Sequence, residues 1–317
     1  LPICGPDVLR LTTRTVPQPA AGEVLVKVTA AGVNGPDMMQ RKGLYPAPKG
    51  ASDLLGLEVS GEVVAVGDQV SRWKTGDKIV ALTNGGGYAE YVTIDGAHCL
   101  PVPSGVGMVD AAGLPETYFT VWSNVFIGAG LTAGETFLVH GGAGGIGATC
   151  IQLGKAFGAK VLATDSPAER CDFCRSLGAD RVIDYRTEDF VDIVREAGGA
   201  NVILDIVGGA NIEKNMKAAS HDARIIQLAF AQGSKVDINL MPVMLKRLTY
   251  TGSTLRTRPS AYKARVAREL EEKVWPLICA GRIKPVVNAT FPLADAAKAH
   301  ALMESSTHMG KIVLKIG

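Results

Sequence analysis

The feature that most constrains the fold is a glycine-rich turn between a short apolar strand and a helix. Phe137–His140 is an apolar run, and glycine occupies four of the six positions from 142 to 147. A helical pattern follows, and KVLAT at 160–164 closes the unit as the next strand. We expect this turn to be a ligand-binding site formed by Gly142, Ala143, Gly144, Gly145, Ile146 and Gly147.

Such a turn can hold a pyrophosphate against backbone N–H groups at the helix N-terminus, because no Cβ obstructs the approach. The alternative is a turn that only allows close packing of strand and helix, and four glycines are more than packing requires. The sequence therefore predicts a dinucleotide-binding βαβ unit.

The end of the second strand bears on which dinucleotide is bound. Asp165 stands about 20 positions beyond the loop, where a carboxylate normally binds the adenosine ribose 2′-OH and favours NAD. Ser166 and Arg170 are suited instead to a 2′-phosphate. A charge pair 4 Å apart is worth about 4 kcal/mol at an effective dielectric of 20, so Asp165 and Arg170 can nearly cancel each other. Asp165 also has a structural interpretation as the N-cap of the helix that starts near Pro167.

The pattern of apolar and polar residues changes near residue 136. Before it, segments such as 22–33, 58–67 and 88–94 alternate apolar and polar residues, as β-strands do. After it, short apolar runs alternate with helical segments, which is typical of a parallel sheet. A long amphipathic helix over 262–281, a helix over 294–305 and a last strand at 311–316 then follow. We expect an α/β protein with a β-rich domain at 1–118 and 257–317, and a doubly wound nucleotide-binding domain at 119–256.

Charge and cysteine content exclude several classes of protein. The 317 residues carry 33 Lys and Arg against 31 Asp and Glu, so nothing in the net charge of +2 favours nucleic acid or an anionic membrane. No apolar stretch reaches the roughly 18 residues that span a bilayer. Six dispersed cysteines indicate a reducing compartment, and we expect a cytoplasmic protein. The chain opens at Leu1 rather than Met, and we expect a few residues to precede it.

Other reactive side chains have simpler explanations than catalysis. Cys171 and Cys174 form a CxxC pair, but they share a helical face with Leu177 ahead of Gly178, which favours a core position over a zinc or redox site. The five histidines show no i,i+4 pairing, so we expect surface or capping roles and assign none of them to catalysis. Arg265 and Arg268 alternate with acidic residues and form a solvated helix face.

Several motifs together resemble a known superfamily. VKVTAAGVNGPDMMQRKGLYPAPKGAS, LGLEVSGEVVAVG, PETYFTVW, HGGAGGIG and TGSTLR, in this order, resemble the medium-chain dehydrogenase/reductase superfamily, in particular its zinc-free quinone oxidoreductase branch. The likeness covers essentially the whole chain. It implies a GroES-like catalytic domain, a Rossmann domain, and a cleft between them where nicotinamide meets substrate.

The resemblance also implies that no metal is bound. Zinc-dependent members carry a Cys ligand where Asn34 stands and a Gly-His-Glu motif where this chain has Gly56-Leu57-Glu58. Their lobe with four structural cysteines has no counterpart between Leu82 and Tyr91. A catalytic zinc needs about three N, S or O protein ligands, and here two of them are replaced by an amide and an aliphatic side chain.

By the same resemblance, Tyr45 and Asn34 line the substrate pocket. A Tyr phenol can hydrogen-bond a carbonyl oxygen as negative charge develops on it, and Asn34 can position the substrate. The structural alternatives are a turn aromatic packed on prolines for Tyr45 and a turn former for Asn34. Gly144 stands where some relatives have a serine implicated in activity. Cofactor contacts implied by the family's segments are Thr120, Tyr185, Gly208, Phe230, Thr254, Leu255 and Arg256.

We therefore expect hydride transfer from NAD(P)H to a quinone or another small conjugated carbonyl, with NADP(H) preferred and NAD(H) left open by Asp165. One alternative is an enoyl-thioester reductase, since relatives share the fold. Another is a cofactor-binding protein of low turnover, as the lens crystallins of this branch illustrate. Relatives commonly dimerise through an edge strand of the nucleotide domain, so we expect a homodimer or homotetramer.

Overall fold

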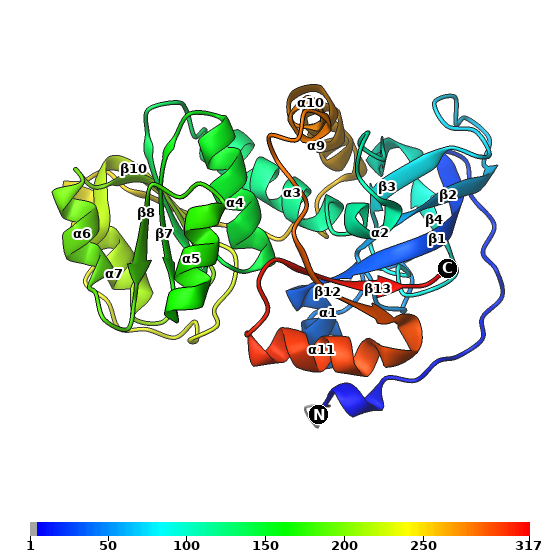
Figure 1. The fold of residues 1–317 in the computed structure, drawn as a ribbon, viewed down its shortest axis with the longest axis horizontal. Coiled ribbons are helices and arrows are strands. Elements are labelled where there is room, and N and C mark those ends of the chain that lie inside the picture. Colours follow the sequence, from blue (N-terminus) through cyan, green and yellow to red (C-terminus); the bar gives the residue numbers. More distant parts are fainter. Residues whose placement is uncertain (1–4) are drawn as a thin grey trace. The chain divides into compact units, whose positions relative to one another are not determined.

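The chain forms two compact units in the computed structural model, which describes residues 5–317 (Figure 1). Unit 1 extends to Phe119 and resumes at Arg256, and unit 2 comprises Thr120–Leu255. These limits fall one residue inside the predicted limits of the central domain. Unit 2 is thus one continuous segment inserted into the sequence of unit 1.

Unit 2 is built on a parallel sheet of six strands in the order β11-β10-β9-β6-β7-β8. The chain starts in the middle with β6, runs outward to β8, returns to β9 beside β6, and runs outward again to β11. This is the doubly wound order, in which ligands bind outside the carboxyl ends of the strands. The strands are β6 (Thr136–His140), β7 (Lys160–Asp165), β8 (Arg181–Asp184), β9 (Ala200–Asp205), β10 (Ala219–Gln227) and β11 (Thr249–Gly252).

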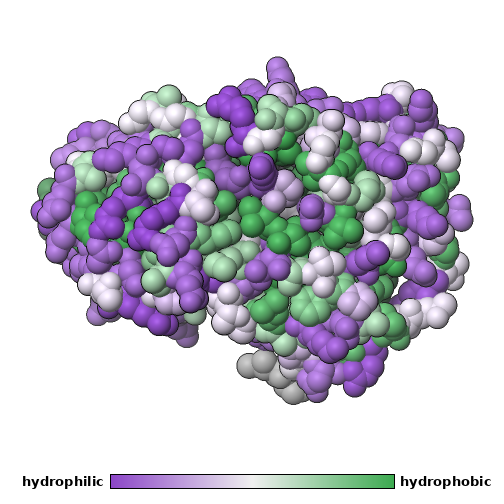
Figure 2. All heavy atoms as spheres, viewed as in Figure 1, coloured by the Kyte–Doolittle hydropathy of each residue, from purple (hydrophilic) through white to green (hydrophobic). Residues whose placement is uncertain are grey.

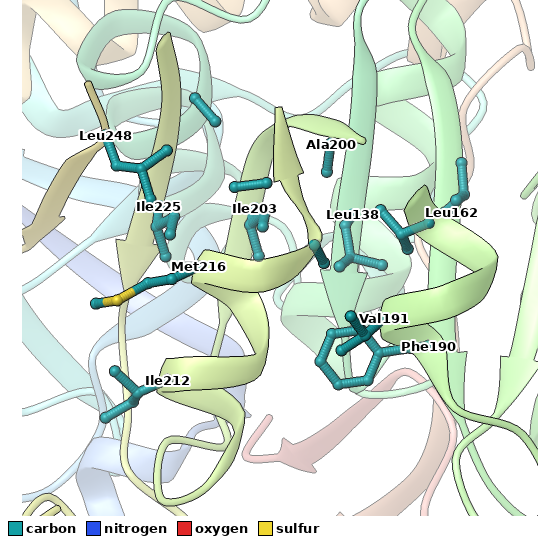
Figure 3. Packing of buried hydrophobic residues seen from close by; sticks show 14 of the residues in the cluster. Leu138, Leu162, Phe190, Val191, Ala200, Ile203, Ile212, Met216, Ile225 and Leu248 are labelled. Atoms are coloured by element: carbon teal, nitrogen blue, oxygen red, sulfur yellow. The ribbon is translucent and has the colours of Figure 1, made fainter. Parts of the chain in front are cut away.

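Helices cover both faces of this sheet (Figure 1), so its central strands β6, β7 and β9 are buried along most of their length rather than at alternate residues. Figure 3 shows part of the core, in which Phe190 and Met216 pack against Leu138 and Ile203. The outer face of unit 2 seen in Figure 2 is covered mainly by hydrophilic side chains. The helices are α4 (Gly145–Ala156), α5 (Ala168–Ser176), α6 (Phe190–Glu196), α7 (Asn211–Ala218) and α8 (Met241–Leu245), preceded by the π-helix η3 (Trp122–Gly128).

Unit 1 contains a seven-stranded sheet in the order β12-β13-β1-β2-β3-β5, with β4 also paired to β1. All its pairs are antiparallel except β12 with β13. The last strand, β13, lies between β12 and β1, so both ends of the sequence contribute to the centre of the sheet. The strands are β1 (Glu23–Val33), β2 (Glu58–Val66), β3 (Lys78–Leu82), β4 (Tyr91–Asp95), β5 (Cys99–Pro101), β12 (Val287–Pro292) and β13 (Lys311–Lys315).

The expected long helix over 262–281 is interrupted in the structure. The first part, α9 (Ser260–Lys273), ends before Val274, and α10 (Trp275–Cys279) begins with Trp275-Pro276. Proline has no N–H to donate and its ring disfavours a helical residue before it, which explains the break. The other helical segments of unit 1 are η1 (Pro6–Val8), α1 (Gly35–Arg41), η2 (Gly96–His98), α2 (Met108–Ala111), η4 (Leu293–Asp295) and α11 (Ala296–Ser305). The helix α3 (Pro115–Val121) begins in unit 1 and ends two residues beyond Phe119, in unit 2.

Candidate functional site

The predicted cofactor residues of unit 2 gather where the strands end. Because all six strands are parallel, their carboxyl ends lie along one edge of the sheet. Each strand is followed within a few residues by at least one predicted contact, and only Thr120, in α3, lies elsewhere in this unit. In chain order after β6 to β11 these are Gly142 to Gly147, then Asp165, Ser166 and Arg170, then Tyr185, Gly208, Phe230, and finally Thr254 and Leu255.

The glycine loop has the features of an anion site. A Cβ on Gly147 would lie 2.2 Å from the Gly141 carbonyl oxygen, so the tight turn requires glycine there, whereas a Cβ on Gly144 would meet only that oxygen, at 3.6 Å. Within residues 5–317, the backbone amides of residues 145–147 have no acceptor, and the first turn of α4 contains no acidic residue. Free N–H groups at a helix N-terminus attract phosphate.

Asp165 binds the glycine loop instead of capping a helix. Its Oδ2 accepts the Ala143 amide at 2.7 Å, and its Oδ1 accepts the Ser166 amide at 2.9 Å. Arg170 Nε donates to Oδ1 at 2.6 Å, which confirms the expected ion pair. The N-cap interpretation is wrong, because Pro167 occupies the N-cap of α5 and Asp165 is only 3% exposed.

Ser166 lies at the same strand end. Its buried hydroxyl has no partner at hydrogen-bonding geometry within the described part of the chain. It contributes, after the Arg186 amide, to lowering the pKa of the nearby Asp184 carboxyl group. The Ser166 amide and the Arg170 guanidinium share Oδ1 of Asp165, so both residues lie at one strand end, and donors of these types fit a phosphate group of a dinucleotide.

Two further predicted contacts are neighbours at the ends of β9 and β10. A Cβ on Gly208, whose φ is +68°, would lie 2.8 Å from Cδ1 of Phe230, so the ring lies directly against this glycine. The Gly208 amide donates to Asp205 Oδ1, which fixes the turn after β9. Phe230 is 46% exposed and Tyr185, after β8, is 54% exposed. Exposed aromatic rings at strand ends are available to stack on a bound ring system.

In unit 1, Asn34 belongs to a buried polar cluster. Its Nδ2 donates to Glu58 Oε1 at 2.8 Å, and its Oδ1 accepts from Lys311 Nζ. Lys311 Nζ is 2.7 Å from Glu58 Oε1 and also donates to the Val33 carbonyl at 3.1 Å. Asn34 is only 5% exposed, and both its Nδ2 and its Oδ1 are engaged. It therefore acts by holding Glu58 and Lys311 in place.

These residues do not fit a zinc ion. Asn34 and the 3% exposed Leu57 stand at the expected ligand positions, and neither offers a thiolate or an imidazole. Glu58 already forms an ion pair, and the Lys311 ammonium beside it would repel a cation. Over residues 5–317, no group of three or more His, Cys, Asp or Glu side chains is arranged to hold a metal.

A second chain of hydrogen bonds ends at Asp37, which is fully buried in α1. Tyr88 Oη lies 3.2 Å from Asp37 Oδ2 and 3.2 Å from His300 Nε2, and His300 Nδ1 lies 3.0 Å from Arg41 Nη1. Arginine can only donate, so Nδ1 of a neutral His300 accepts and its Nε2–H points to Tyr88. Burial raises the pKa of Asp37 to about 6, although the amides of Asn34 and Gly56 oppose the shift.

Tyr45 lies beside the buried Arg256, which shares Asn84 with a second buried cation, Lys263. The Arg256 guanidinium carbon is 5.4 Å from the centre of the Tyr45 ring, and Nη1 donates to the Tyr45 carbonyl at 3.4 Å. Arg256 also donates to the Asn84 carbonyl at 2.6 Å and 3.0 Å, and Lys263 Nζ donates to Asn84 Oδ1 at 2.7 Å. The Tyr45 phenol is partly exposed and makes no hydrogen bond within residues 5–317. It is therefore available to a substrate.

Lys263, Lys311 and Glu116 also belong to this region and were not predicted from the sequence. Lys263 had a signal, since it shares the apolar face of α9 with Val266, Ala267 and Leu270. A lysine at such a position is buried with partners. Lys311 had no such signal in the sequence, because KIVLK is an ordinary strand sequence.

The structure also corrects the assignment of the histidines. His98, His140 and His300 are 6% exposed or less and are held by hydrogen bonds, so they are not surface residues. Cys171 and Cys174 are buried on one face of α5, as expected, and Gly178 follows with φ of +101°. Arg265 and Arg268 are exposed, also as expected.

Unit 1 also contains a hollow of about 1120 Å³. It lies between the N-terminal segment Leu9–Pro17 and the strand β4, and neither Tyr45 nor Asn34 lines it. Its lining includes Asn84 and Tyr88, so it borders the polar clusters described above. In the described residues, no helix is long and apolar enough to cross a membrane.

A doubly wound sheet with a glycine loop, joined to a discontinuous β-rich unit, defines a dinucleotide-dependent dehydrogenase or reductase. Two family models match the chain: "Alcohol dehydrogenase GroES-like domain" at residues 20–104 and "Zinc-binding dehydrogenase" at 177–314. Quinone oxidoreductase of Rattus norvegicus is 32% identical over 98% of this chain and 94% of its own length. The chain belongs to the quinone oxidoreductases of the medium-chain dehydrogenase/reductase superfamily.

Solved structures agree with this assignment. Escherichia coli quinone oxidoreductase complexed with NADPH has a TM-score of 0.87 and 30% identity, covering 98% of this chain and 97% of that one. An NAD-dependent alcohol dehydrogenase has a TM-score of 0.88 and 30% identity over 99% and 97%. The CurK enoyl reductase has a TM-score of 0.86 and 26% identity over 98% and 96%. The fold is that of the superfamily, with its GroES-like domain and Rossmann sheet, and the protein is an oxidoreductase.

Proposed function

We propose that the protein reduces a quinone or another small conjugated carbonyl with NADPH, by direct hydride transfer and without a metal. The observation that carries the proposal is the nearly full-length likeness to quinone oxidoreductases, combined with a glycine loop whose amides are free to bind phosphate. The bound cofactor supplies the hydride, and the protein supplies binding and orientation.

The residues at the strand ends fit NADP(H). The amides of residues 145–147 would hold the pyrophosphate, and Ser166 and Arg170 would donate to a 2′-phosphate. Asp165 has both oxygens engaged by donors of its own unit, so it is poorly placed to accept a ribose hydroxyl, and this favours NADP(H) over NAD(H). Gly208, Phe230 and Tyr185 would contact the ring systems.

Tyr45 would act on the substrate carbonyl. Burial, followed by the negative charge of Glu116, raises the pKa of the Tyr45 phenol, and Arg256 lowers it. The phenol therefore keeps its proton at neutral pH and can donate a hydrogen bond to an oxygen that becomes negative as hydride arrives. Asn34 would act indirectly, by holding Glu58 and Lys311 in place through its two hydrogen bonds.

The test of the function is a substrate panel with wild type and Tyr45→Phe. Loss of nicotinamide absorbance with quinones, enones and enoyl-thioesters identifies the substrate class. One neutral hydrogen bond is worth about 0.5–1.5 kcal/mol, so the variant should lower kcat for quinones roughly two- to tenfold, with cofactor affinity unchanged. No turnover with any of these acceptors would refute the proposed function and favour a cofactor-binding protein of low turnover.

The absence of a metal is tested separately. Purified protein should contain no stoichiometric zinc and should keep its activity in the presence of a chelator, because the donor set around Asn34 and Leu57 cannot replace thiolate and imidazole ligands. About one zinc per chain, with activity lost to the chelator, would overturn this part of the proposal.

An enoyl-thioester reductase is the second candidate, favoured by the similarity to the CurK enoyl reductase. If Tyr45 is the residue that then also donates the proton to carbon, Tyr45→Phe should cost about 10²-fold on that substrate class. The ratio of the two losses separates the candidates.

A further inference from the structure

The motif PETYFTVW places Glu116 in the first turn of α3, beside the buried cluster of Asn34, Glu58 and Lys311. The Glu116 amide donates to Glu58 Oε2 at 2.8 Å, while Glu58 Oε1 accepts from Asn34 Nδ2 and pairs with Lys311 Nζ. Glu58 is fully buried, so this bond fixes the start of α3 against β2.

The carboxyl group of Glu116 has a different environment from its backbone. It is partly buried, and within residues 5–317 its oxygens take part in no hydrogen bond or ion pair. Every other carboxylate of this region is engaged: Glu58 by Lys311, and Asp37 by two amides and Tyr88. A partly buried carboxyl group without a partner is costly unless it is protonated or meets a ligand.

Charged groups from several elements surround this carboxyl group. Burial and then the negative charge of Glu58 raise the pKa of Glu116 to about 8, and Asp37 acts in the same direction. The positive charges of Lys311 and Lys263 oppose the shift. The groups that face it are Glu58 in β2, Asp37 in α1, Lys311 in β13, Lys263 in α9, and the side chains of Tyr45 and Arg256.

Glu116 is therefore mostly protonated at pH 7, in contrast to Asp37, whose pKa is about 6. Two carboxyl groups in one region with different protonation states is an arrangement that enzymes use for acid–base chemistry. The O–H of Glu116 is close enough to Tyr45 and Arg256 for its charge state to shift the pKa of both.

We propose that Glu116 is the general acid that protonates the reduced substrate. The inference rests on the proposed reductase function. With an enone, the bound cofactor would supply hydride to the β-carbon, which would break the C=C π bond and leave an enolate. The enolate takes the carboxyl proton of Glu116 at its α-carbon, and the resulting carboxylate regains a proton from water. With a quinone, the product oxygen can take its proton from water, so Glu116 matters less.

The test compares wild type with Glu116→Gln on 2-cyclohexen-1-one and 1,4-benzoquinone, with NADPH, between pH 6 and 9.5. For the enone, wild-type kcat/KM should fall about tenfold per pH unit above about 8, as the acid is lost. Glu116→Gln should be about 10²-fold slower at pH 7 and show no break near pH 8. Its benzoquinone turnover should stay within about threefold of wild type.

A spectroscopic readout is independent of turnover. The infrared band of a protonated carboxyl group should titrate near pH 8 in wild type and be missing from Glu116→Gln, while a band from Asp37 titrates lower. Glu272→Gln, on the exposed side of α9, makes the same substitution outside the site and should behave as wild type. If Glu116→Gln melts at a much lower temperature, Glu116→Asp replaces it and should keep a pH break displaced from 8.

The outcomes separate the two proposals. An unchanged enone pH profile in Glu116→Gln, or no carboxyl band near pH 8, refutes the role of Glu116 and leaves the reductase function intact. Wild-type turnover of benzoquinone without any enone turnover also refutes it. Failure of wild type on both substrates refutes the proposed function itself.

Discussion

The buried pair of Glu58 and Lys311 offers the most direct test of what stabilises unit 1. The Glu58 side chain is fully buried and that of Lys311 is 8% exposed, and the ammonium has three acceptors: Glu58, Asn34 and the Val33 carbonyl. Lys311→Met keeps the length of the stem and removes the charge. Glu58 is then a buried carboxylate without a counter-ion, and we expect unit 1 to lose about 3–5 kcal/mol.

A double variant distinguishes loss of the ion pair from loss of packing. In Glu58→Gln with Lys311→Met, no charge is buried, and the new amide can donate to Asn34 Oδ1 while its oxygen accepts the Glu116 amide. We expect this variant to recover more than half of the loss, because replacing both partners of a buried pair is far cheaper than removing one. Lys298→Met is the matched control, since Lys298 forms a surface pair with Asp295 at 69% exposure and should change stability by less than about 1 kcal/mol.

Native-state hydrogen exchange in peptides from β1, β2 and β13 measures this directly, because it reports on unit 1 even when the two units unfold separately. A loss of 3–5 kcal/mol corresponds to exchange faster by about two to four orders of magnitude. A Lys311→Met effect no larger than that of Lys298→Met would refute the reasoning, as would a double variant no more stable than the single one.

Three other predictions concern the loop, the cofactor and pH. Arg170→Ala should raise the NADPH KM at least about tenfold and the NADH KM much less, because it also exposes the charge of Asp165; equal changes in steady-state kinetics would contradict this. Gly147→Ala should abolish NADPH binding in calorimetry, because its Cβ would lie 2.2 Å from the Gly141 carbonyl oxygen. Near-normal affinity would show that the loop backbone can move to accommodate the Cβ. The folded-state pKa of Asp37, about 6 against the ordinary 3.8, means that the folded protein binds more protons in that interval, so stability should fall by up to about 3 kcal/mol as pH rises through it. Asp37→Asn should flatten that part of the stability profile, and an unchanged slope in urea titrations at several pH values would contradict the assignment.

The strand, glycine turn and helix around residues 136–156 were predictable because their signal is local. A strand, a glycine turn and a helix lie within about 20 consecutive residues, and each constrains the others. The direction of the Asp165 carboxylate was not predictable, since it is set by the Ala143 amide 22 positions earlier. Sequence reasoning offered a ribose contact or a helix cap, and the side chain holds the loop instead.

The site of unit 1 shows the same limit more strongly. Asn34 and Tyr45 were proposed from a family resemblance, but the groups that determine their electrostatic environment come from distant parts of the chain. Lys311 is separated from Asn34 by 277 positions, and the pairing of β13 with β1 brings them together. No local pattern contains this information, because burial and charge pairing arise only once the sheet is formed.

The discontinuity of unit 1 has a consequence for synthesis. The segment of unit 2 is continuous and can fold once Leu255 has left the ribosome, whereas the sheet of unit 1 stays incomplete until Lys311–Lys315 is made. Until then β1 lacks one neighbour, and Glu58 lacks its counter-ion. The nascent chain thus carries an unfinished N-terminal half and a folded insert, and a stop codon ahead of Lys311 would leave it permanently in that state.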